Sequence, residues 1–277
     1  MTAVLADRLP PDDGRWAFEF KWDGVRALVF VEDGRACVQG RRLNDVTDRY
    51  PEVAGVAGDL DGRPAILDGE IVALDDRGRP SFQRLQQRMH VSSAIQVRRR
   101  MSQVPVAWLG FDVLSLDGAS TMDLDYADRR RLLDGLGLAG PTWQVPPSHP
   151  GDGASVLEAS RTAGLEGIVA KRVDSRYEPG KRSRCWLKLK NHQRQELVVG
   201  GWLVGDGARA DRFGSLMVGY HDDEGRLRYA GNVGTGFTDK TLAELSTVLQ
   251  GLRRDSSPFV DTPRLGGRMV FVEPVLV

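Results

Sequence analysis

The chain has 277 residues, and its 38 basic side chains balance 38 acidic ones, so its net charge neither favours nor excludes a nucleic-acid partner. A hydrophobic content of 41% with 27% charged residues is typical of one large or two smaller globular domains and excludes a disordered or fibrous chain. No apolar run approaches the roughly 18 residues of a membrane span, and two cysteines are too few for a disulfide framework, so we expect no membrane partner and a reducing cytoplasm.

The first 190 residues predict strands interleaved with helices. Alternating apolar side chains predict strands over residues 15–22, 25–41, 66–74, 104–118, 166–173 and 184–190. Asp33 and Gly34 predict a hairpin turn inside the second of these ranges. Ser81 is expected to begin a helix, and two more helices are predicted over 126–138 and 154–164. This mixture predicts an α+β domain over residues 1–191.

After Asn191 the pattern changes to short strands separated by glycine and aspartate turns. These strands are predicted over residues 196–205, 213–225, 226–234 and 268–275. Thr238 can cap a helix over 238–254, in which four leucines lie on one face: Leu242, Leu245, Leu249 and Leu252. One helix between the third and fourth strands predicts a small barrel of the oligonucleotide-binding (OB) type. We therefore expect a second domain over 192–277, with the boundary near residues 190–195.

Lysine is used sparingly in this chain. Only six of the 38 basic residues are lysines: Lys21, Lys171, Lys181, Lys188, Lys190 and Lys240. Arginine is effectively never deprotonated, whereas lysine can lose its proton and become an amine nucleophile. Codon bias and chance explain any single lysine, but they explain less well why four of the six fall between residues 171 and 190.

The stretch FEFKWDGVRA, residues 18–27, places Lys21 in a predicted strand and completes the pattern K-x-D-G-x-R with Asp23, Gly24 and Arg26. A nucleophilic Lys21 must react as the neutral amine, which burial and neighbouring cations favour. A glycine lets the backbone approach a phosphate closely, and an arginine can form two hydrogen bonds with a phosphate or hydroxyl group. An ordinary surface lysine in a hairpin would give the same residues, so this pattern alone does not decide whether Lys21 is a nucleophile.

Two further stretches suggest contacts with a nucleoside. LDGEIV places Glu70 on a strand, where its carboxylate could accept hydrogen bonds from ribose hydroxyls. GFDV offers Phe111 as a surface on which a purine could stack. The structural alternatives are a surface ion pair for Glu70 and core packing for Phe111.

Two later stretches add charged candidates. In LEGIVAKR, Glu166 and Lys171 are five residues apart, which on a strand means opposite faces unless a bulge intervenes. WLKLK sets Lys188 and Lys190 two residues apart, and therefore on one face of a strand. A carboxylate at the exit of a helix is the structural alternative for Glu166.

In chain order, these stretches resemble a known motif series. K-W-D-G-V-R, G-R-R-L-N-D-V-T, L-D-G-E, G-F-D-V, E-G-I-V-A-K and W-L-K-L-K are similar to the successive motifs of the covalent nucleotidyltransferases, and most of all to those of ATP-dependent DNA ligases of the bacterial end-joining type. The resemblance covers the chain from Trp16 to its end. It implies an α+β fold in which an adenylation domain of antiparallel sheets and helices precedes an OB domain, with ATP bound between strands.

The resemblance also implies a reaction. Lys21 would attack the α-phosphorus of ATP to form lysyl-AMP, AMP would pass to the 5′-phosphate of a nick, and the 3′-hydroxyl would displace AMP to seal the strand. Magnesium or manganese is expected, because carboxylate and water ligands suit hard cations. Nicked or broken double-stranded DNA is the implied partner, with a Ku-like end-binding protein or attached polymerase and nuclease modules as further candidates. The implied setting is bacterial non-homologous end joining by a monomer in the nucleoid-containing cytoplasm.

The resemblance assigns roles to individual residues. Glu19 matches a position that contacts adenine, and Phe111 matches one that stacks on the base. Arg26, Arg41 and Glu70 match positions around the ribose and phosphates. Glu166 and Asp23 match the metal ligands. The phosphate-binding lysines are matched by Lys171, Lys188 and Lys190, and a further nucleotide-binding arginine is matched by Arg182.

A basic stretch supports the DNA partner. Residues 171–194 carry nine lysines and arginines against Asp174 and Glu178, an excess of seven (9 − 2). Such an excess on a neutral chain predicts a stripe of basic residues that binds the DNA backbone. Some of these basic residues must instead face ATP. The predicted barrel, with the strands RFGSLMVGY and RLRYAG, would close over the minor groove at a nick. A generic small barrel is the alternative.

The chain departs from the family pattern at two places. In GRRLNDVT, the family usually has asparagine and glycine where this chain has Arg42 and Leu43. The chain stops at FVEPVLV, before the basic motif with which the family grips pyrophosphate. We therefore expect an incomplete OB domain, and a first step that is more impaired than the sealing of preadenylated DNA.

Three alternatives stay open to different degrees. A GTP-dependent RNA-capping guanylyltransferase shares K-x-D-G and the OB domain, and labelling with ATP or GTP separates the two. An NAD-dependent ligase would carry a substantial domain before Lys21 and more cysteines after it. A catalytically silent module that binds nicks or ends would keep its activity in repair after Lys21→Ala.

Overall fold

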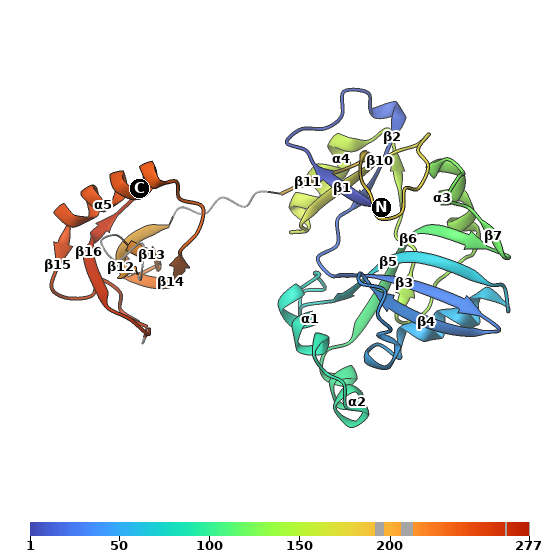
Figure 1. The fold of residues 1–277 in the computed structure, drawn as a ribbon, viewed down its shortest axis with the longest axis horizontal. Helices are drawn as coiled ribbons and strands as arrows, with labels where there is room; N and C mark the ends of the chain where they lie inside the picture. Colours follow the sequence, from blue (N-terminus) through green and yellow to red (C-terminus); the bar gives the residue numbers. More distant parts are fainter. Residues whose placement is uncertain (192–196, 206–212, 264, 277) are drawn as a thin grey trace. The chain divides into compact units, whose positions relative to one another are not determined.

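The computed structural model describes residues 1–191, 197–205, 213–263 and 265–276. The chain forms two compact units, Met1–His192 and Gln193–Val277 (Figure 1). Residues 192–195, where the boundary was expected, lie outside the described residues, as does Arg194 of the predicted basic stripe. In the described part of the chain, no helix is both long and apolar enough to span a membrane.

The first sheet of the first unit has five strands in the order β1-β11-β10-β2-β9. Their bounds are Thr2–Leu5, Arg182–Lys190, Gly167–Arg172, Trp16–Phe20 and His149–Pro150. Strand β1 runs parallel to β11, and the other neighbours are antiparallel. Helix α4, Gly153–Thr162, packs against β2 and β10, where Phe18, Val156 and Ile168 are buried.

The second sheet lies beside the first in the same unit and has the order β4-β3-β5-β6-β7, with β8 paired to β6 (Figure 1). The bounds of these strands are Arg35–Gly40, Val25–Glu32, Ala65–Ala73, Val106–Leu116, Ala119–Ser120 and Trp143–Gln144. The hairpin turn predicted between β3 and β4 is confirmed. Asp33 and Gly34 both have positive φ angles, 49° and 70°, which suits a two-residue turn between right-twisted strands.

Three helices complete the first unit: α1 (Phe82–Met89), α2 (Ala94–Gln103) and α3 (Tyr126–Gly135). The expected start of α1 is confirmed, because the side chain of Ser81 accepts a hydrogen bond from the Arg84 backbone at 3.3 Å. Helix α2 was not predicted. Helix α3 packs against β6 and presents its first residue, Tyr126, to the interior of the unit.

The second unit is an antiparallel sheet of five strands with the order β14-β13-β12-β16-β15. Their bounds are Leu227–Val233, Phe213–His221, Val198–Val204, Met269–Val275 and Arg253–Arg254. Helix α5, Asp239–Gly251, follows β14 and is capped by Thr238, as predicted, and buries Leu242 and Leu249. The arrangement is the OB type that the sequence predicted.

One prediction in this unit is wrong in its extent. The helix was expected to continue to Arg254, but it ends at Gly251. Arg253 and Arg254 instead form β15 and pair with Val272 and Phe271 of β16. The pairing with β16 satisfies backbone groups that a longer helix would have satisfied internally.

Candidate active site

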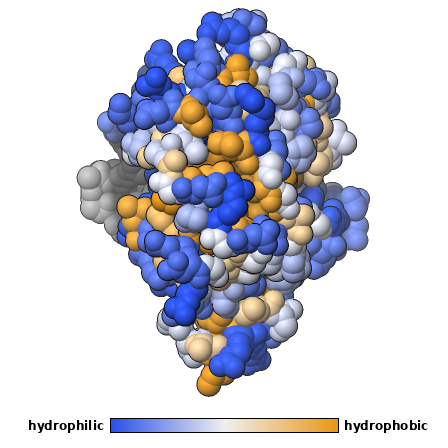
Figure 2. Space-filling view, turned by 90° about the vertical axis from the view of Figure 1, so that its right-hand side faces the viewer, coloured by the Kyte–Doolittle hydropathy of each residue, from blue (hydrophilic) through white to orange (hydrophobic). Residues whose placement is uncertain are grey.

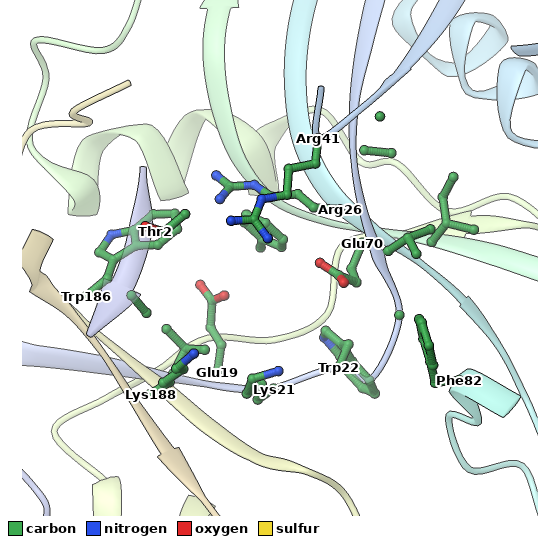
Figure 3. Close-up of a pocket in the computed structure, with 18 of the residues that line it drawn as sticks. Thr2, Glu19, Lys21, Trp22, Arg26, Arg41, Glu70, Phe82, Trp186 and Lys188 are labelled. Atoms are coloured by element: carbon green, nitrogen blue, oxygen red, sulfur yellow. The ribbon is translucent and has the colours of Figure 1, made fainter. Parts of the chain in front are cut away.

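A cavity of about 660 Å³ opens between the two sheets of the first unit (Figure 3). Of the predicted site residues, it is lined by Glu19, Lys21, Arg26, Arg41, Glu70, Phe111, Lys171, Arg182 and Lys188. Glu166 joins the site through an ion pair with Lys21, and Lys190 joins it through an ion pair with Glu166. Asp23 lies in the turn that follows Lys21. The structure therefore gathers residues that are up to 171 positions apart (190 − 19) around one cavity.

Lys21 lies directly after β2, at the edge where β2 meets β10. Its backbone nitrogen donates to the carbonyl oxygen of Gly167 at 2.9 Å, and its Nζ donates to Glu166 Oε2. Lys190 Nζ lies 2.8 Å from the other carboxylate oxygen, Glu166 Oε1. Burial raises the pKa of Glu166, but the hydrogen bonds from Lys190 and Lys21 outweigh it, so the pKa lies below its usual range. Glu166 therefore stays ionised and binds the side chains of both Lys21 and Lys190.

Lys188 adds a further cation to this end of the cavity. Its pKa is lowered by partial burial and by the positive charges of Lys190, Lys21 and Arg182. Strand alternation places Lys188 and Lys190 on the same face of β11, as predicted, where Lys188 lies opposite Val169. These cations form a group that would attract the phosphates of a nucleotide.

Glu19 and Lys171 form a buried pair deeper in the cavity. Lys171 Nζ lies 2.8 Å from Glu19 Oε2, and Tyr126 donates its hydroxyl hydrogen to Glu19 Oε1. Lys171 Nζ also donates to the carbonyl oxygen of Phe111 at 2.9 Å and lies 4.6 Å from the ring centroids of Phe111 and Trp186. Burial lowers the pKa of Lys171. Lys171 thus contacts the residues expected around adenine, whereas Lys190 contacts Glu166.

Arg26 is engaged within the protein. Its Nε donates to Asp68 Oδ1 at 2.9 Å, and its Nη2 donates to the Tyr177 hydroxyl at 2.8 Å. Asp68 is fully buried, so this arginine supplies the charge that the carboxylate needs. The two-pronged contact suggested by the sequence is therefore made here with Asp68, and a contact of Arg26 with a nucleotide stays a prediction.

Glu70 lines the cavity, and in the pairing of β5 with β3 it is the register partner of Arg26. Burial raises the pKa of Glu70 to about 8, although Lys21 and Arg26 act in the opposite direction. Figure 3 shows its carboxyl group directed into the cavity together with Glu19. A carboxyl group in this position can exchange hydrogen bonds with a bound hydroxyl group.

The raised pKa of Glu70 predicts a pH-dependent stability. The folded state holds a proton on Glu70 between pH 4.5 and about 8 that the unfolded chain has lost, so stability falls as the pH rises through this window. Glu70→Gln cannot titrate. Its melting temperature should match the wild type near pH 4.5 and exceed it by a few degrees at pH 8.5. The exposed Glu158→Gln is the control, and a difference for Glu70→Gln that does not change with pH would contradict the prediction.

Two glycines of the motifs are required by close backbone contacts. A Cβ on Gly24 would lie 2.2 Å from the carbonyl oxygen of Ile71, and a Cβ on Gly167 would lie 2.0 Å from that of Leu189. Gly167 also has a φ of 144°, which disfavours any side chain. The close approach at Gly24 is thus to β5, whereas the K-x-D-G pattern suggested an approach to a phosphate.

Gly24→Ala should therefore lower the stability of the first unit. The added methyl group meets a backbone carbonyl that cannot move without disturbing β5, and such overpacking typically costs about 1–3 kcal/mol. Thermal unfolding measures the loss. Gly58→Ala is the matched control, since nothing lies within 4 Å of its Cβ position and its φ is not positive. Equal melting temperatures for the two variants would refute this account of Gly24.

Two family models match the chain. The model of the ATP dependent DNA ligase domain matches residues 11–190, and that of the ATP dependent DNA ligase C terminal region matches residues 209–277. The chain belongs to the ATP-dependent DNA ligases. This ligase is related to the end-joining ligases of bacteria, as the sequence resemblance implied.

Named relatives of the ligase are longer than the chain. The multifunctional non-homologous end joining protein LigD of Mycolicibacterium smegmatis is 41% identical over 265 residues, which cover 95% of this chain and 33% of the relative. The DNA ligase of Thermococcus fumicolans is 34% identical over 286 residues, which cover 99% of this chain and 49% of that relative. A solved mycobacterial DNA ligase D complexed with ATP and MES has a TM-score of 0.63 at 39% identity, covering 99% of this chain and 85% of that one. The chain thus spans a third to a half of these curated relatives.

Several residues of the ligase site were missed by sequence analysis. Tyr126 of α3 donates a hydrogen bond to Glu19, and Arg130 of the same helix forms an ion pair with Glu19, with 3.5 Å between Nη1 and Oε1. Trp186 contacts both Lys171 and the ring of Phe111, and Asp68 and Tyr177 bind Arg26. A second acidic residue, Asp68, in the same largely apolar strand as Glu70, and the tryptophan of WLKLK, were the signals that could have identified two of them.

The acidic residues fit a metal that arrives with the nucleotide. Within the described residues, no group of three or more histidines, cysteines, aspartates or glutamates is arranged to hold an ion. Magnesium is commonly bound through one or two carboxylates together with substrate phosphates. Glu166 and Asp23 offer such oxygens beside Lys21, and Glu166 is kept ionised by its two lysines.

Proposed function

We propose that this ligase joins nicks and ends in double-stranded DNA through an adenylate carried on Lys21. The observation that carries the proposal is the placement of Lys21. Its side chain is only 22% exposed, its amine is hydrogen-bonded to Glu166, and it lies in a cavity whose other walls carry Lys188, Arg182 and the aromatic ring of Phe111. The cations fit a polyphosphate, and the ring fits a base.

The reaction proceeds in three balanced transfers. In the first, the neutral Lys21 amine attacks the α-phosphorus of ATP. A phosphorus–nitrogen bond forms, the bond from that phosphorus to the bridging oxygen breaks, and pyrophosphate leaves. The amine proton passes to solvent through Glu166, which already accepts a hydrogen bond from Nζ. Positioning and neutralisation of phosphate charge are the main sources of catalysis in such a step.

The two later transfers return the lysine. An oxygen of the DNA 5′-phosphate attacks the phosphorus of lysyl-AMP, the phosphorus–nitrogen bond breaks, and Lys21 takes up a proton. The 3′-hydroxyl then attacks the 5′-phosphorus, a phosphodiester bond forms, the bond from that phosphorus to the bridging oxygen of the adenylate breaks, AMP leaves, and the hydroxyl proton passes to solvent. Lys21 is therefore required for the first two transfers and not for the third.

The other residues would bind and orient the substrate. Glu19 and Phe111, which lie together at the buried end, would contact the adenine. Arg26, Arg41 and Glu70 would lie around the ribose and the α-phosphate. The cations Lys188, Lys190 and Arg182 would neutralise phosphate charge. Lys171 would act on the nucleotide by orienting Glu19 and Phe111, which it contacts. Glu166 and Asp23 would hold Mg²⁺ or Mn²⁺, which neutralises phosphate oxygens when bound.

The biological setting is proposed from the relatives. The Mycolicibacterium smegmatis relative is described as a multifunctional non-homologous end joining protein. We infer that this ligase acts in double-strand break repair in bacteria, with a Ku-like end-binding protein or with polymerase and nuclease modules as partners.

Incubation with α-labelled ATP and Mg²⁺, followed by a denaturing gel, tests the proposal. The expected result is one labelled band at the mass of the chain, whose label is lost in acid because phosphorus–nitrogen bonds are acid-labile. Chase with nicked DNA should transfer the label and yield sealed product. Labelling by GTP in place of ATP would favour the capping-type alternative, and no labelling by either would overturn the proposal.

A further inference from the structure

One long segment of the first unit carries only positive charge. Between Asp76 and Asp112, residues 77–111 contain seven arginines and no aspartate or glutamate: Arg77, Arg79, Arg84, Arg88, Arg98, Arg99 and Arg100. The chain as a whole is neutral, so this segment departs strongly from its surroundings. It includes α1 and α2, which project from the second sheet at the lower end of this unit in Figure 1.

Four of these arginines have side-chain partners inside the protein, and within the described residues Arg77, Arg98 and Arg99 form no ion pair. Arg79 pairs with Asp75, Arg84 with Asp76 and Arg88 with Glu52. Arg98 and Arg99 lie on α2 and are exposed. An unpaired arginine keeps its full charge available to an external anion.

Arg98 and Arg99 share one face of α2. Val97, which is 3% exposed, points toward the protein, and the positions opposite it on a helix are those of Ile95, Arg98, Arg99 and Ser102. Ile95 is 78% exposed, which is unusual for an isoleucine beside two charges. In Figure 2 the lower end of the surface, where α2 lies, shows hydrophobic and hydrophilic atoms side by side.

Hydrogen bonds fix α1 and α2 to the rest of the first unit. Arg88 of α1 is fully buried and donates to Glu52 Oε1 at 2.8 Å, to the carbonyl oxygen of Arg49 at 2.8 Å and to that of Val104 at 2.9 Å. Arg49 in turn donates to the carbonyl oxygen of Met89 at 3.1 Å. These bonds fasten both helices to the segment before β5, so α2 presents its face in a fixed position.

The active-site cavity extends to α1 and to the segment around Arg49. Its lining includes Phe82 and Met89 of α1, together with Arg42, Arg49 and Tyr50. The segment that packs against α2, Thr47–Arg49, contributes one exposed acid, Asp48. A polyanion that enters the cavity from this side would therefore meet a surface with a net positive charge next to α2.

We propose that the outward face of α2, formed by Ile95, Arg98, Arg99 and Ser102, binds the phosphate backbone of the DNA duplex that the ligase seals. The inference rests on the proposed function, and it names a contact outside the nucleotide cavity. Arginines contact phosphates with two parallel hydrogen bonds, and backbone contacts of this kind set the position of a duplex without reading its sequence. Ile95 fits between them against the apolar edge of a deoxyribose.

The double variant Arg98→Ala/Arg99→Ala tests this proposal in the full chain. Binding to a nicked duplex is measured at several salt concentrations, and covalent labelling by ATP without DNA is measured beside it. The loss of two phosphate contacts should lower the slope of log affinity against log salt by about 1.8. Affinity at low salt should fall on the order of tenfold. Labelling by ATP should be unchanged, because neither arginine lines the cavity.

Arg131→Ala/Arg161→Ala is the matched control, because it removes the same charge from two exposed helix positions on α3 and α4. The control should leave the salt slope unchanged. An unchanged slope in the α2 variant, an equal fall in both variants, or a loss of labelling by ATP would each overturn the proposal. So would a loss of binding to poly-glutamate with DNA binding intact, which would indicate an acidic protein partner. A wild-type chain that binds DNA through α2 but forms no adenylate would refute the proposed function alone.

Discussion

Lys21→Arg is expected to abolish formation of the covalent adenylate, with a loss of more than roughly 10⁴-fold. Arginine keeps the positive charge that Glu166 holds in the folded chain, so the fold and the binding of ATP should survive. It cannot supply a neutral amine, because its guanidinium is effectively never deprotonated. Labelling with α-labelled ATP on a denaturing gel measures the loss.

A second readout separates chemistry from folding in this variant. The last transfer, attack of the 3′-hydroxyl on adenylated DNA, forms no bond to Lys21, so sealing of a preadenylated nick should persist. Lys240→Arg on α5 is the control, since that lysine is 84% exposed and pairs only with Glu244 among the described residues. Full labelling of Lys21→Arg would show that another residue carries the adenylate.

Local chemistry made parts of the fold predictable. The turn at Asp33 and Gly34 requires two positive φ angles, which these residues tolerate better than most. The caps at Ser81 and Thr238 depend only on a hydroxyl and a backbone N–H three residues later. Each of these signals lies within a few residues, so the sequence alone displays it.

Contacts between distant segments were not predictable in the same way. Strand β1 pairs in parallel with β11, about 180 residues later, with a register shift after Ala3. No local pattern specifies such a partner. The end of α5 at Gly251 is a related case, because the pairing of Arg253 and Arg254 with β16 competes with two more helical residues and prevails.

The motifs predicted which residues line the site better than how those residues pair. Arg26 was assigned to the nucleotide, yet its nearest carboxylate, Asp68, lies 42 residues away and had not been considered. Lys171 was grouped with the phosphate lysines, and the structure places it against Glu19 and Phe111. Glu166 lies before the first residue of β10, so the strand alternation by which the spacing of five was judged does not apply to it.

Removal of the charge of Asp112 is expected to have the largest effect on stability. Asp112 of β6 and Arg129 of α3 are both fully buried, and Arg129 donates Nε to Asp112 Oδ1 at 2.8 Å and Nη2 to Oδ2 at 3.0 Å. Arg129 Nη1 also donates to the carbonyl oxygens of Leu124 and Ser175. Asp112→Asn would leave a buried guanidinium without its counter-charge, which typically costs about 3–5 kcal/mol.

The melting temperature of Asp112→Asn should fall by roughly 10 °C in thermal unfolding. Asp117→Asn is the matched control, because Asp117 makes the same two-pronged contact with Arg63, but on the surface, where both side chains are about half exposed. Its melting temperature should match that of the wild type. The double variant Asp112→Leu/Arg129→Met, which removes both buried charges, should recover much of the loss. If Asp112→Asn and Asp117→Asn have the same melting temperature, the buried pair contributes no more than a surface pair, and the cost expected from leaving Arg129 without its counter-charge is wrong.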